Sequence, residues 1–453
     1  MTDTKTVAVI LAAGLGTRMK SDLPKVMHAL AGRPMVEHLL GNLKSLNLDQ
    51  IIVVIGDGME TVAEAVKPHA TVLQTERLGT AHAVLAARDY LESFDGELLI
   101  LYGDTPLIST TTLEAMLSAL QAPEKPAAVV LGFSPDSPGM YGRLIVDQEK
   151  NLLEIVEAQE ANPDQLAVGL CNSGVMALDG ASALNYLSRI GNDNSKGEYY
   201  LTDIVSLSVS EQRVCRVVEG ETTELLGINS RFELANAEMI VQSYLRVQAM
   251  DGGATLTDPE TVYFSFDTKI GRDVLIGPSV FFGPGVTIED RVEIRPFCHI
   301  EGATVSSGAI VGPFARLRPG AILKENVHIG NFVEVKNATL ETGSKANHLT
   351  YIGDARVGAG ANIGAGTITC NYDGYFKSHT DIGAGAFIGS NTALVAPVKI
   401  GDGAMIGAGS VIAKDVAADA LAVERAPHKE VPDLARKIRE RKSAEKEKSK
   451  KNT

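Results

Sequence analysis

The sequence predicts an α/β protein built from two parts, a helix-covered and mostly parallel sheet followed by a parallel β-helix. Up to about residue 228, short β-branched runs alternate with helical stretches, which is typical of strand–helix–strand units. Beyond about residue 250, aliphatic residues recur at every sixth position, the period of a solenoid with one short strand per repeat. With 453 residues, the chain is long enough for two such domains.

Composition and charge exclude several classes of protein. The 42 basic and 56 acidic residues give a net charge of -14, which argues against a general nucleic-acid binder. The four cysteines form no C-x-x-C pair, so neither a zinc ribbon nor a disulfide framework is indicated and a reducing compartment is favoured. No stretch approaches about 18 apolar residues and no charged-then-apolar leader is seen, so we expect a cytoplasmic protein without membrane insertion.

Six apolar runs in the first part are predicted to be strands: VAVILAA, IIVVIG, TVLQT, ELLILYGD, AAVVLGF and VCRVVEG. Ligands of such sheets bind at the carboxyl ends of the strands, where Gly14 and Asp104 are both expected. The stretch 229–250 has apolar residues at intervals of three and four and is followed by paired glycines, which predicts a connecting helix.

A glycine-rich turn, GLGTRMKSDLPK, follows the first predicted strand. A Rossmann fingerprint would need a third glycine where Met19 stands, and a Walker loop would need Gly-Lys-Ser/Thr, so neither motif is present. Gly14 and Gly16 nevertheless allow close backbone approach. Together with Arg18 and Lys25, the backbone N–H groups of this turn could converge on a polyphosphate.

Two further positions in the first part have chemistry that suits a nucleotide. Asp104 follows a strand, so its carboxylate could bind the Mg²⁺ of a nucleoside triphosphate, or it could equally cap the next turn. Gln74 precedes a Gly79-Thr80 turn, and its amide could match the donors and acceptors of uracil. The short polar breaks YGR, IVE, CNSG and GIN read individually as ordinary turns.

Three series of aliphatic residues with a period of six define the predicted β-helix. They are Ile270, Ile276, Phe282, Ile288, Ile294 and Ile300; Val305, Val311, Leu317, Leu323, Ile329 and Val335 in a shifted phase; and Ile382, Ile388, Leu394, Ile400, Ile406 and Ile412. The repeat fails at Thr369–Asp381, which is expected to loop out and, with the neighbouring HLTYIGDA, to border a second site. The charged segment 428–453 is expected to be a partly helical or disordered, solvated tail rather than a phosphate-binding arm.

The order of the motifs is the basis of a family resemblance. GLGTRM…PK, QxxxxGTAHA, YGDTP, MYGR, IVEA, CNSG and GINSR, followed by a hexapeptide solenoid with HLTYIGDA and CNYDG, resemble the bifunctional bacterial N-acetylglucosamine-1-phosphate uridyltransferase/glucosamine-1-phosphate acetyltransferase family over nearly the whole chain. The resemblance implies an N-terminal Rossmann-like nucleotidyltransferase domain and a C-terminal left-handed parallel β-helix. The implied segments are a uridyltransferase domain 1–228, a linker helix 229–250, an acetyltransferase domain 251–427 and a charged tail 428–453.

The resemblance also implies the reactions and the assembly. An acetyl group would pass from acetyl-CoA to glucosamine-1-phosphate, and a Mg²⁺-dependent uridyl transfer from UTP would then give UDP-N-acetylglucosamine and pyrophosphate. This product serves peptidoglycan and lipopolysaccharide synthesis, and the partners would be small molecules rather than nucleic acid. The family implies a homotrimer with its acetyltransferase site between subunits.

The resemblance assigns roles in the first site residue by residue. The nucleotide would be approached by Leu11, Ala12, Ala13 and Gly14, and its uracil would be read by Gln74, Gly79 and Thr80. Arg18 and Lys25 would neutralise the phosphates as catalytic groups. N-acetylglucosamine phosphate would be held by Tyr102, Gly142, Glu157 and Asn172. Asp104 and Asn229 would hold Mg²⁺, with Asn229 also touching substrate, and Arg77 departs from the glutamine that relatives often carry.

In the second site, acetyl transfer to an amine needs a base, and the resemblance implies that His348 is this base. A histidine in a solenoid is otherwise more often an exposed residue without a catalytic role. Glucosamine phosphate would be bound by Arg318, Lys336, Tyr351 and Asn362. Acetyl-CoA would be contacted by Ala365, Asn371, Tyr372, Ser390, Ala408 and Arg425.

Two alternatives remain beside this interpretation. A single-function sugar-phosphate nucleotidyltransferase with a structural solenoid is disfavoured by His348, Tyr351 and the CNYDG loop. A scaffold with decayed sites would be expected to have lost one of four residues, and all are present: Arg18, Lys25, Asp104 and His348.

Overall fold

Strand β1 (Thr6–Leu11) lies inside the sheet of the first part and is aliphatic and buried over most of its length. The computed structural model describes residues 4–451. The sheet has the order β11-β7-β10-β6-β1-β4-β5, and its neighbours are parallel except that β10 runs antiparallel to β6 and β7. Its other strands are β4 (Gln50–Gly56), β5 (Ala70–Gln74), β6 (Glu97–Tyr102), β7 (Ala128–Phe133), β8 (Arg143–Val146), β9 (Leu152–Val156), β10 (Cys171–Asp179) and β11 (Cys215–Glu219), and a small hairpin pairs β2 (Ala29–Leu30) with β3 (Arg33–Pro34).

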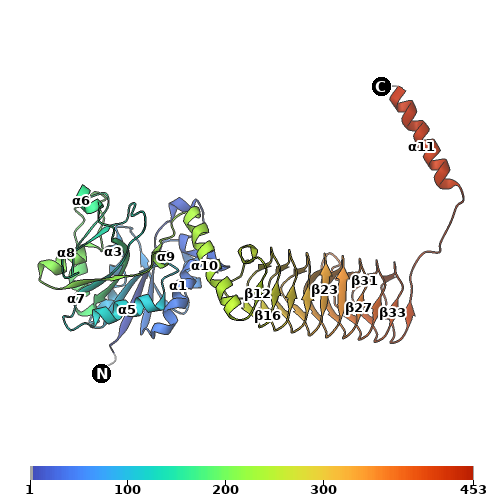
Figure 1. The fold of residues 1–453 in the computed structure, drawn as a ribbon, viewed down its shortest axis with the longest axis horizontal. Coiled ribbons are helices and arrows are strands. Elements are labelled where there is room, and N and C mark those ends of the chain that lie inside the picture. Colours follow the sequence, from blue (N-terminus) through green and yellow to red (C-terminus); the bar gives the residue numbers. More distant parts are fainter. Residues whose placement is uncertain (1–3, 452–453) are drawn as a thin grey trace. The chain divides into compact units, whose positions relative to one another are not determined.

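Helices cover both faces of this sheet because successive strand residues point to opposite sides. Val7 and Val9 belong to one buried cluster, and Ala8 and Ile10 belong to the other. The helices are α1 (Met35–Leu43), α2 (Glu60–Ala65), α3 (Thr80–Leu85), α4 (Arg88–Leu91), α5 (Thr110–Leu120), α6 (Pro163–Leu166), α7 (Gly180–Leu187), α8 (Asp203–Ser210) and α9 (Thr222–Leu225) (Figure 1). Single 3-10 turns lie at Thr17–Met19, Lys25–Met27 and Lys44–Leu46. The mostly parallel α/β sheet predicted from the sequence is confirmed.

The predicted connecting helix is α10 (Arg231–Asp251). The chain divides into two compact units near residue 250, and the segment Tyr263–Asp267 returns to the first unit. The Gln242 amide explains this return, because it donates to the Phe264 carbonyl at 2.7 Å and accepts from the Phe264 N–H at 2.8 Å. The domain limits at 228, 250 and 427 stay predictions.

The second unit is a left-handed parallel β-helix whose short strands stack on three faces (Figure 1). The first face contains β12 (Thr255–Leu256), β14 (Leu275–Ile276), β17 (Glu293–Ile294), β20 (Ile310–Val311), β23 (His328–Asn331), β25 (Lys345–His348), β27 (Asn362–Ile363), β30 (Phe387–Ile388), β33 (Met405–Ile406) and β35 (Leu421–Ala422). The second contains β15 (Phe281–Phe282), β18 (His299–Ile300), β21 (Arg316–Leu317), β28 (Ile368–Cys370), β31 (Ala393–Val395) and β34 (Val411–Ile412). The third contains β13 (Lys269–Ile270), β16 (Thr287–Ile288), β19 (Ala303–Val305), β22 (Ala321–Leu323), β29 (Thr380–Ile382) and β32 (Val398–Ile400).

Two longer strands, β24 (Glu334–Leu340) and β26 (Tyr351–Val357), run across a corner and join the second and third faces into one sheet. Each turns the corner at a residue with a left-handed backbone, Asn337 in β24 and Asp354 in β26. These two residues therefore lie one above the other at the same corner.

The core of the β-helix includes the apolar residues predicted from the period of six. All of them are buried except Ile270, which is half-buried. Ile270 pairs with Ile288 and Ile288 pairs with Val305, so one coil is shorter by a residue than the coil before it. This shorter coil is the physical reason for the shifted phase of the second series.

The predicted insertion leaves the solenoid between β28 and β29. Its segment Asn371–His379 closes through an antiparallel bridge between Tyr372 and Lys377, and the Asp373 carboxylate accepts the N–H groups of Tyr375 and Phe376. The ends of the predicted range stay in the strands, because Thr369 belongs to β28 and Asp381 to β29.

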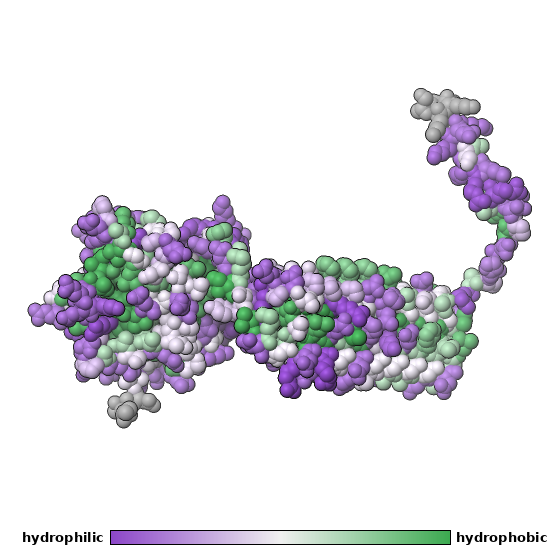
Figure 2. All heavy atoms as spheres, in the orientation of Figure 1, coloured by the Kyte–Doolittle hydropathy of each residue, from purple (hydrophilic) through white to green (hydrophobic). Residues whose placement is uncertain are grey.

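The charged tail contains α11 (Leu434–Lys451), which Figure 2 shows to be largely hydrophilic. In the described residues of α11, every side chain up to Lys448 is exposed. Within the range 4–451, none of the helices combines the length and the apolar character that a membrane span requires.

Candidate functional sites

The carboxyl ends of β1, β5 and β6 border a cavity of about 240 Å³ in the first unit. Its lining is Leu11, Ala12, Ala13, Gly14, Lys25, Val26, Gln74, Arg77, Gly79, Thr80, Ala83, Tyr102, Asp104 and Glu198. The structure thus brings together the residues predicted to approach the nucleotide, to read uracil and to bind metal through Asp104. Arg18 lies outside this lining and is exposed in the 3-10 turn Thr17–Met19.

The glycine-rich turn has room for both a ligand and the lysine stem. A side chain at Gly14 would meet no atom within 4 Å, so the backbone there is open to a ligand. Gly16 has a positive φ of 62°, and a Cβ on it would lie 2.6 Å from the Cβ of Lys25. Gly16 therefore lets the Lys25 side chain pass close to the turn and enter the cavity.

The turn expected to read the base is held by its own hydrogen bonds. Gln74 ends β5 and is buried, and its amide nitrogen donates to the Gly79 carbonyl at 3.2 Å. Gly79 has φ 116°, and a Cβ on it would lie 2.5 Å from the Tyr199 carbonyl oxygen, so a side chain has no place there. The hydroxyl of Thr80 accepts the Leu201 N–H at 3.0 Å. The turn therefore presents a fixed set of polar groups.

Arg77 lines the cavity and had no role in the sequence-based prediction. Its Nε donates to the Ala13 carbonyl at 2.8 Å, so it ties the base-side turn to the glycine-rich turn. Gly56 makes space for this contact, because a Cβ there would collide with the Arg77 guanidinium. In the sequence, the only indication of a special role for this position was that it has arginine where relatives often have glutamine. Glu198 also lines the cavity, and no sequence motif indicated it.

A cluster of three polar side chains lies at one end of this site. The Lys25 ammonium donates to Asp104 Oδ2 and, at 2.9 Å, to Asn229 Oδ1. The Ile228 N–H donates to the Asp104 carbonyl at 2.9 Å, which brings the GIN segment to the end of β6. The Asn229 N–H is held by the Glu233 carboxylate at 2.7 Å. Asp104 and Asn229, far apart in the sequence, thus face one cation.

Tyr102 connects the cavity to the residues predicted to hold the sugar. Burial raises the pKa of its phenol, and the charges of Asp104 and Glu157 raise it further. Gly174 of the CNSG motif has φ 91°, and a Cβ on it would lie 2.8 Å from the Tyr102 ring. Gly174 is therefore the residue that lets β10 pass against this ring.

The remaining sugar residues meet around β8 and β10. The Asn172 N–H donates to the Gly142 carbonyl at 2.8 Å, and the Asn172 side chain accepts the Gly174 N–H at 2.9 Å. Burial raises the pKa of the Glu157 carboxyl, and nearby Glu160 and Asp203 add to the shift, against an opposing effect of Lys196.

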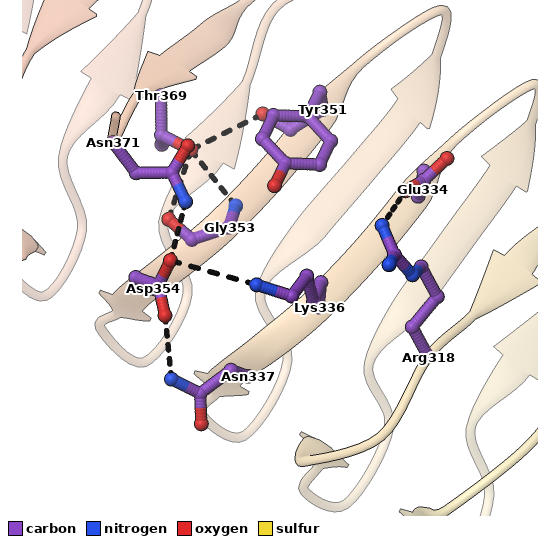
Figure 3. Close-up of polar contacts among 9 residues, drawn as sticks. All are labelled: Arg318, Glu334, Lys336, Asn337, Tyr351, Gly353, Asp354, Thr369 and Asn371. Carbon is purple, nitrogen blue, oxygen red and sulfur yellow. Dashed lines mark hydrogen bonds and ion pairs between the residues drawn. The ribbon is translucent and has the colours of Figure 1, made fainter. Parts of the chain in front are cut away.

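On the β-helix, the predicted phosphate-binding residues lie on neighbouring coils around the corner formed by β24 and β26 (Figure 3). Arg318 pairs with Glu334 at 2.9 Å, and Lys336 lies 3.9 Å from Asp354. Tyr351 begins β26 and lies over Gly353, where a Cβ would be 2.6 Å from the phenol carbon that carries the hydroxyl.

Asp354 joins three parts of this site (Figure 3). Its carboxylate accepts hydrogen bonds from Asn337, at 2.6 Å, and from Asn371 of the inserted loop, and it faces Lys336. Burial by itself would raise the pKa of Asp354, but the two amide hydrogen bonds and the Lys336 charge lower it below its usual value. Asp354 was not among the predicted residues, because its role depends on the contact between the loop and the corner.

His348 is exposed at the end of β25, and its Nδ1 lies 2.8 Å from Asn331 Oδ1 on the coil before it. An amide oxygen only accepts, so this contact favours the tautomer of the neutral imidazole that has its proton on Nδ1 and a free lone pair on Nε2. Asn331 was missed in the sequence analysis. It lies 17 residues before His348, close to one coil, so the repeat itself could have pointed to it.

The residues predicted to contact acetyl-CoA extend from His348 along one corner. The Gly366 N–H donates to the His348 carbonyl, the Asn391 N–H to the Ala365 carbonyl and the Gly409 N–H to the Ser390 carbonyl. This ladder places His348, Ala365, Ser390 and Ala408 at equivalent positions of successive coils.

Three other predicted residues flank this corner differently. Arg425 is exposed next to Gly409, whose added Cβ would lie 3.7 Å from Arg425 Cδ. Tyr372 is exposed on the inserted loop, and its hydroxyl donates to the Gly374 carbonyl at 2.6 Å. Asn362 lies on the first face, whereas Tyr351 lies on the second, so one coil does not bring these two together.

Comparison with known proteins agrees with both halves of the structure. The MobA-like NTP transferase domain family matches residues 8–161. The bacterial transferase hexapeptide family (six repeats) matches residues 267–302 and 379–414. A solved structure described as UDP-glucose pyrophosphorylase complexed with UDP-glucose has a TM-score of 0.45 and 16% identity over 53% of this chain and 99% of that chain, values too low to establish a shared fold.

Relatives match the chain along its whole length. A bifunctional protein GlmU from Paramagnetospirillum magneticum is 60% identical over 448 residues, which are 99% of this chain and 100% of that protein. A bifunctional protein GlmU from Rhodospirillum rubrum is 64% identical over 96% of this chain and 98% of its own length, and one from Zymomonas mobilis is 50% identical over the same shares. Identity at this level across both units shows that the chain belongs to the GlmU family of bifunctional proteins.

Proposed function

We propose that the two sites divide the two reactions of this bifunctional enzyme. On the β-helix, an acetyl group passes from acetyl-CoA to glucosamine-1-phosphate. In the first unit, the resulting N-acetylglucosamine-1-phosphate receives the uridyl group of UTP, and pyrophosphate leaves. The observation that carries the proposal is the convergence of Lys25, Asp104 and Gln74 on one cavity, while His348 and Arg318 lie on the other unit.

In the uridyl site, the sugar phosphate oxygen attacks the α-phosphorus of UTP in line with the departing pyrophosphate. Gln74 and Gly79 read the uracil, while Tyr102, Glu157 and Asn172 hold the sugar. Lys25 is inside the cavity, and the exposed Arg18 is on the turn beside it, where it can reach phosphates that extend outward. Positioning and charge neutralisation supply most of the acceleration in such a transfer.

The same site suits Mg²⁺. A Mg²⁺ ion needs one or two protein oxygens and takes its other ligands from phosphate and water. Asp104 and Asn229 present a carboxylate and an amide oxygen to one point, and a cation, the Lys25 ammonium, already lies between them. The residues therefore fit the metal, and Asp104 and Asn229 would hold it. Bound there, Mg²⁺ would neutralise negative charge on the triphosphate.

In the acetyl site, the glucosamine nitrogen attacks the thioester carbonyl, so a C–N bond forms and the C–S bond breaks. His348 Nε2 takes the proton from the nitrogen, and CoA leaves as its thiol after protonation. Asn331 fixes the tautomer that keeps Nε2 free. Arg318 and Lys336 bind the sugar phosphate, and Tyr351 lies beside the sugar. Asn362 lies on another face of the β-helix, so it contributes to the site of a neighbouring copy of the chain. Acetyl-CoA lies along Ala365, Asn371, Tyr372, Ser390, Ala408 and Arg425.

The acetyl site is completed in a homotrimer. His348, Ser390 and Ala408 are exposed in the single chain. Next to His348, the corner continues over the preceding coils as an aromatic ridge, which we define as Phe297, Phe314, Phe332 and Leu349. Its phenylalanine rings stack at 4.8 and 5.2 Å, and each ridge side chain is about half exposed. An apolar ridge next to a catalytic group suits contact with a second copy of the chain.

The cysteines bear on the cellular compartment. All four cysteines are free, which accords with a reducing cytoplasm.

The experiment that tests the proposal separates the two reactions. Purified protein is incubated with glucosamine-1-phosphate, acetyl-CoA, UTP and Mg²⁺, and free CoA thiol and pyrophosphate are measured. His348→Ala is expected to abolish thiol release from glucosamine-1-phosphate while sparing uridyl transfer to added N-acetylglucosamine-1-phosphate. Asp104→Ala is expected to do the reverse. Loss of both activities in either folded variant would contradict two separate sites.

A further inference from the structure

The contact between Lys25 and the two oxygens of the proposed metal site has a consequence for metal binding. The ammonium donates to both Asp104 Oδ2 and Asn229 Oδ1, so it occupies the space between the two oxygens that are proposed to hold the metal. The side chains of Lys25 and Asp104 are only 13% and 15% exposed, which leaves little water to screen the pair. A divalent cation and the ammonium would repel each other strongly at one point in such a site.

The cavity offers the ammonium a second place to go. The Lys25 stem passes close to Gly16, and the lining next to it is the open backbone at Gly14, where phosphates of a nucleotide would lie. Swinging toward a phosphate would give the ammonium a new anionic partner. The same movement would uncover Asp104 and Asn229.

We propose, on the basis of the function proposed above, that Lys25 closes the metal site of the nucleotide-free enzyme and opens it when a phosphate takes its ammonium. Metal and nucleotide then bind cooperatively, because each removes the obstacle to the other. Lys25 is in this respect a gate for the metal as well as a partner of the phosphates. The free enzyme has low affinity for a divalent cation at this site.

The test measures binding of Mn²⁺ alone, since carboxylate and amide oxygens that suit Mg²⁺ also bind Mn²⁺. Free Mn²⁺ is followed by its EPR signal during titration of the nucleotide-free full-length protein. Lys25→Met keeps the length of the side chain and removes its charge. Because the charge-assisted contact between Lys25 and Asp104 then no longer competes with the metal, the variant is expected to bind one Mn²⁺ at least about tenfold more tightly than wild type. The double variant Lys25→Met/Asp104→Ala is expected to lose this gain.

Lys20→Met is the matched control, because Lys20 is an exposed lysine in the same segment without a contact to Asp104, and its affinity for Mn²⁺ is expected to equal that of wild type. Retained acetyl transfer and an unchanged circular dichroism spectrum show that each variant is folded. If Lys25→Met binds Mn²⁺ as weakly as wild type or more weakly, the proposal that Lys25 closes the metal site is wrong.

A separate measurement tests whether Asp104 holds the metal at all. If Asp104 holds the metal, the conservative Asp104→Asn raises the Mg²⁺ concentration that its residual uridyl transfer requires. An unchanged requirement contradicts the metal assignment itself. A raised requirement together with unchanged Mn²⁺ affinity in Lys25→Met contradicts only the gate.

Discussion

At the scale of single residues, one reactive side chain in each site is held by a polar partner that decides what it can do. Lys25 is held by the two oxygens of the proposed metal site, and His348 is held by an amide oxygen that favours a proton on its Nδ1. In both cases the partner comes from a distant part of the sequence or from another coil. The chemistry of the residue therefore depends on a contact that its own motif does not contain.

The contact between Asn331 and His348 predicts a measurable effect on acetyl transfer. In Asn331→Leu, the imidazole loses the acceptor for its Nδ1 proton and can adopt the unproductive tautomer. We expect kcat for acetyl transfer to fall by about ten- to a hundredfold, the usual cost of losing such a supporting contact. Uridyl transfer in the same chain is the internal control and is expected to be unchanged.

Asn331→Asp gives the matching conservative test. It keeps an acceptor oxygen and adds a negative charge, which stabilises the positively charged imidazole relative to the neutral one. The acid limb of the pH profile of acetyl transfer should therefore move to higher pH, with most activity retained above it. A profile identical to wild type in both variants would rule out the positioning role.

The lowered pKa of Asp354 predicts a pH dependence of stability. A carboxyl with a lower pKa in the folded state stabilises the fold above its unfolded pKa, and this contribution is lost as pH falls through the lower folded value. We expect Asp354→Asn to be less stable than wild type at pH 7, by about 1 kcal/mol, and the difference to shrink below its usual pKa of 3.8. The urea-unfolding midpoints of the two proteins, compared at pH 7 and at a pH below 3.8, measure this difference in stability.

The control for this experiment is Asp433→Asn, at an exposed aspartate beside α11. It is expected to unfold at the wild-type midpoint at neutral pH. A difference between Asp354→Asn and wild type that grows on acidification would have the wrong sign and would reject the explanation.

At the scale of elements, each site is assembled where loops from separate strands are tied together. In the first unit, Arg77 links the turn after β5 to the turn after β1. On the β-helix, Asp354 links β24, β26 and the inserted loop. Gly56 leaves the space for the Arg77 link, and Gly79 and Gly353 leave space for the backbone of Tyr199 and the ring of Tyr351. The sheet and the solenoid provide rigid supports, and the cross-links set the positions of the loops.

The Arg77 link predicts a selective change in UTP binding. In Arg77→Gln, the hydrogen bond to Ala13 is lost and the two turns no longer move together. We expect KM for UTP to rise about tenfold, equivalent to one hydrogen bond of a charged donor, with kcat nearly unchanged. Steady-state uridyl transfer at saturating N-acetylglucosamine-1-phosphate measures both constants.

Arg77→Lys retains a donor and is expected to restore part of the affinity for UTP. Acetyl transfer should be unaffected in both variants, because Arg77 lies in the other unit. If KM for UTP stays at the wild-type value in Arg77→Gln, the link has no role in nucleotide binding.

At the scale of the whole molecule, the two units are folded around separate cores and contain separate sets of reactive groups. The first unit encloses its cavity within one chain. The residues of the proposed acetyl site, in contrast, include exposed ones at a corner of the β-helix, and the aromatic ridge continues this corner over the coils before His348. The two reactions are therefore expected to differ in their dependence on assembly.

This difference predicts the effect of breaking the homotrimer proposed above. The double variant Phe314→Asp/Phe332→Asp places two charges on the aromatic ridge. We expect light scattering to report a monomer and acetyl transfer to fall at least about a hundredfold, because buried unpaired charge is costly at an interface. Uridyl transfer should remain close to wild type.

Phe232→Asp, at an exposed phenylalanine of α10 in the first unit, is the matched control and should stay trimeric. A double variant of the aromatic ridge that remains a trimer with full acetyl transfer would show that the ridge is not the interface.

Local patterns in the sequence determined much of the architecture. The period of six predicted the β-helix because each inward position must be aliphatic, and these residues are buried. The alternation of strands and helices predicted the sheet, and the rule for strand ends placed Gly14 and Asp104 at one cavity. Glycine-rich turns and the order of motifs pointed to the chemistry, since they depend on neighbours in the chain.

Only the tertiary structure decided which distant side chains meet. Asn331 reaches His348 through the register of two coils, Asp354 reaches Asn371 through the path of a loop, and Arg77 reaches Ala13 across two strand ends. It also kept Arg18 outside the cavity lining and separated Asn362 from Tyr351. Local periodicity follows from the geometry of one strand or turn, whereas such contacts depend on how several elements pack, and no short stretch of sequence contains that information.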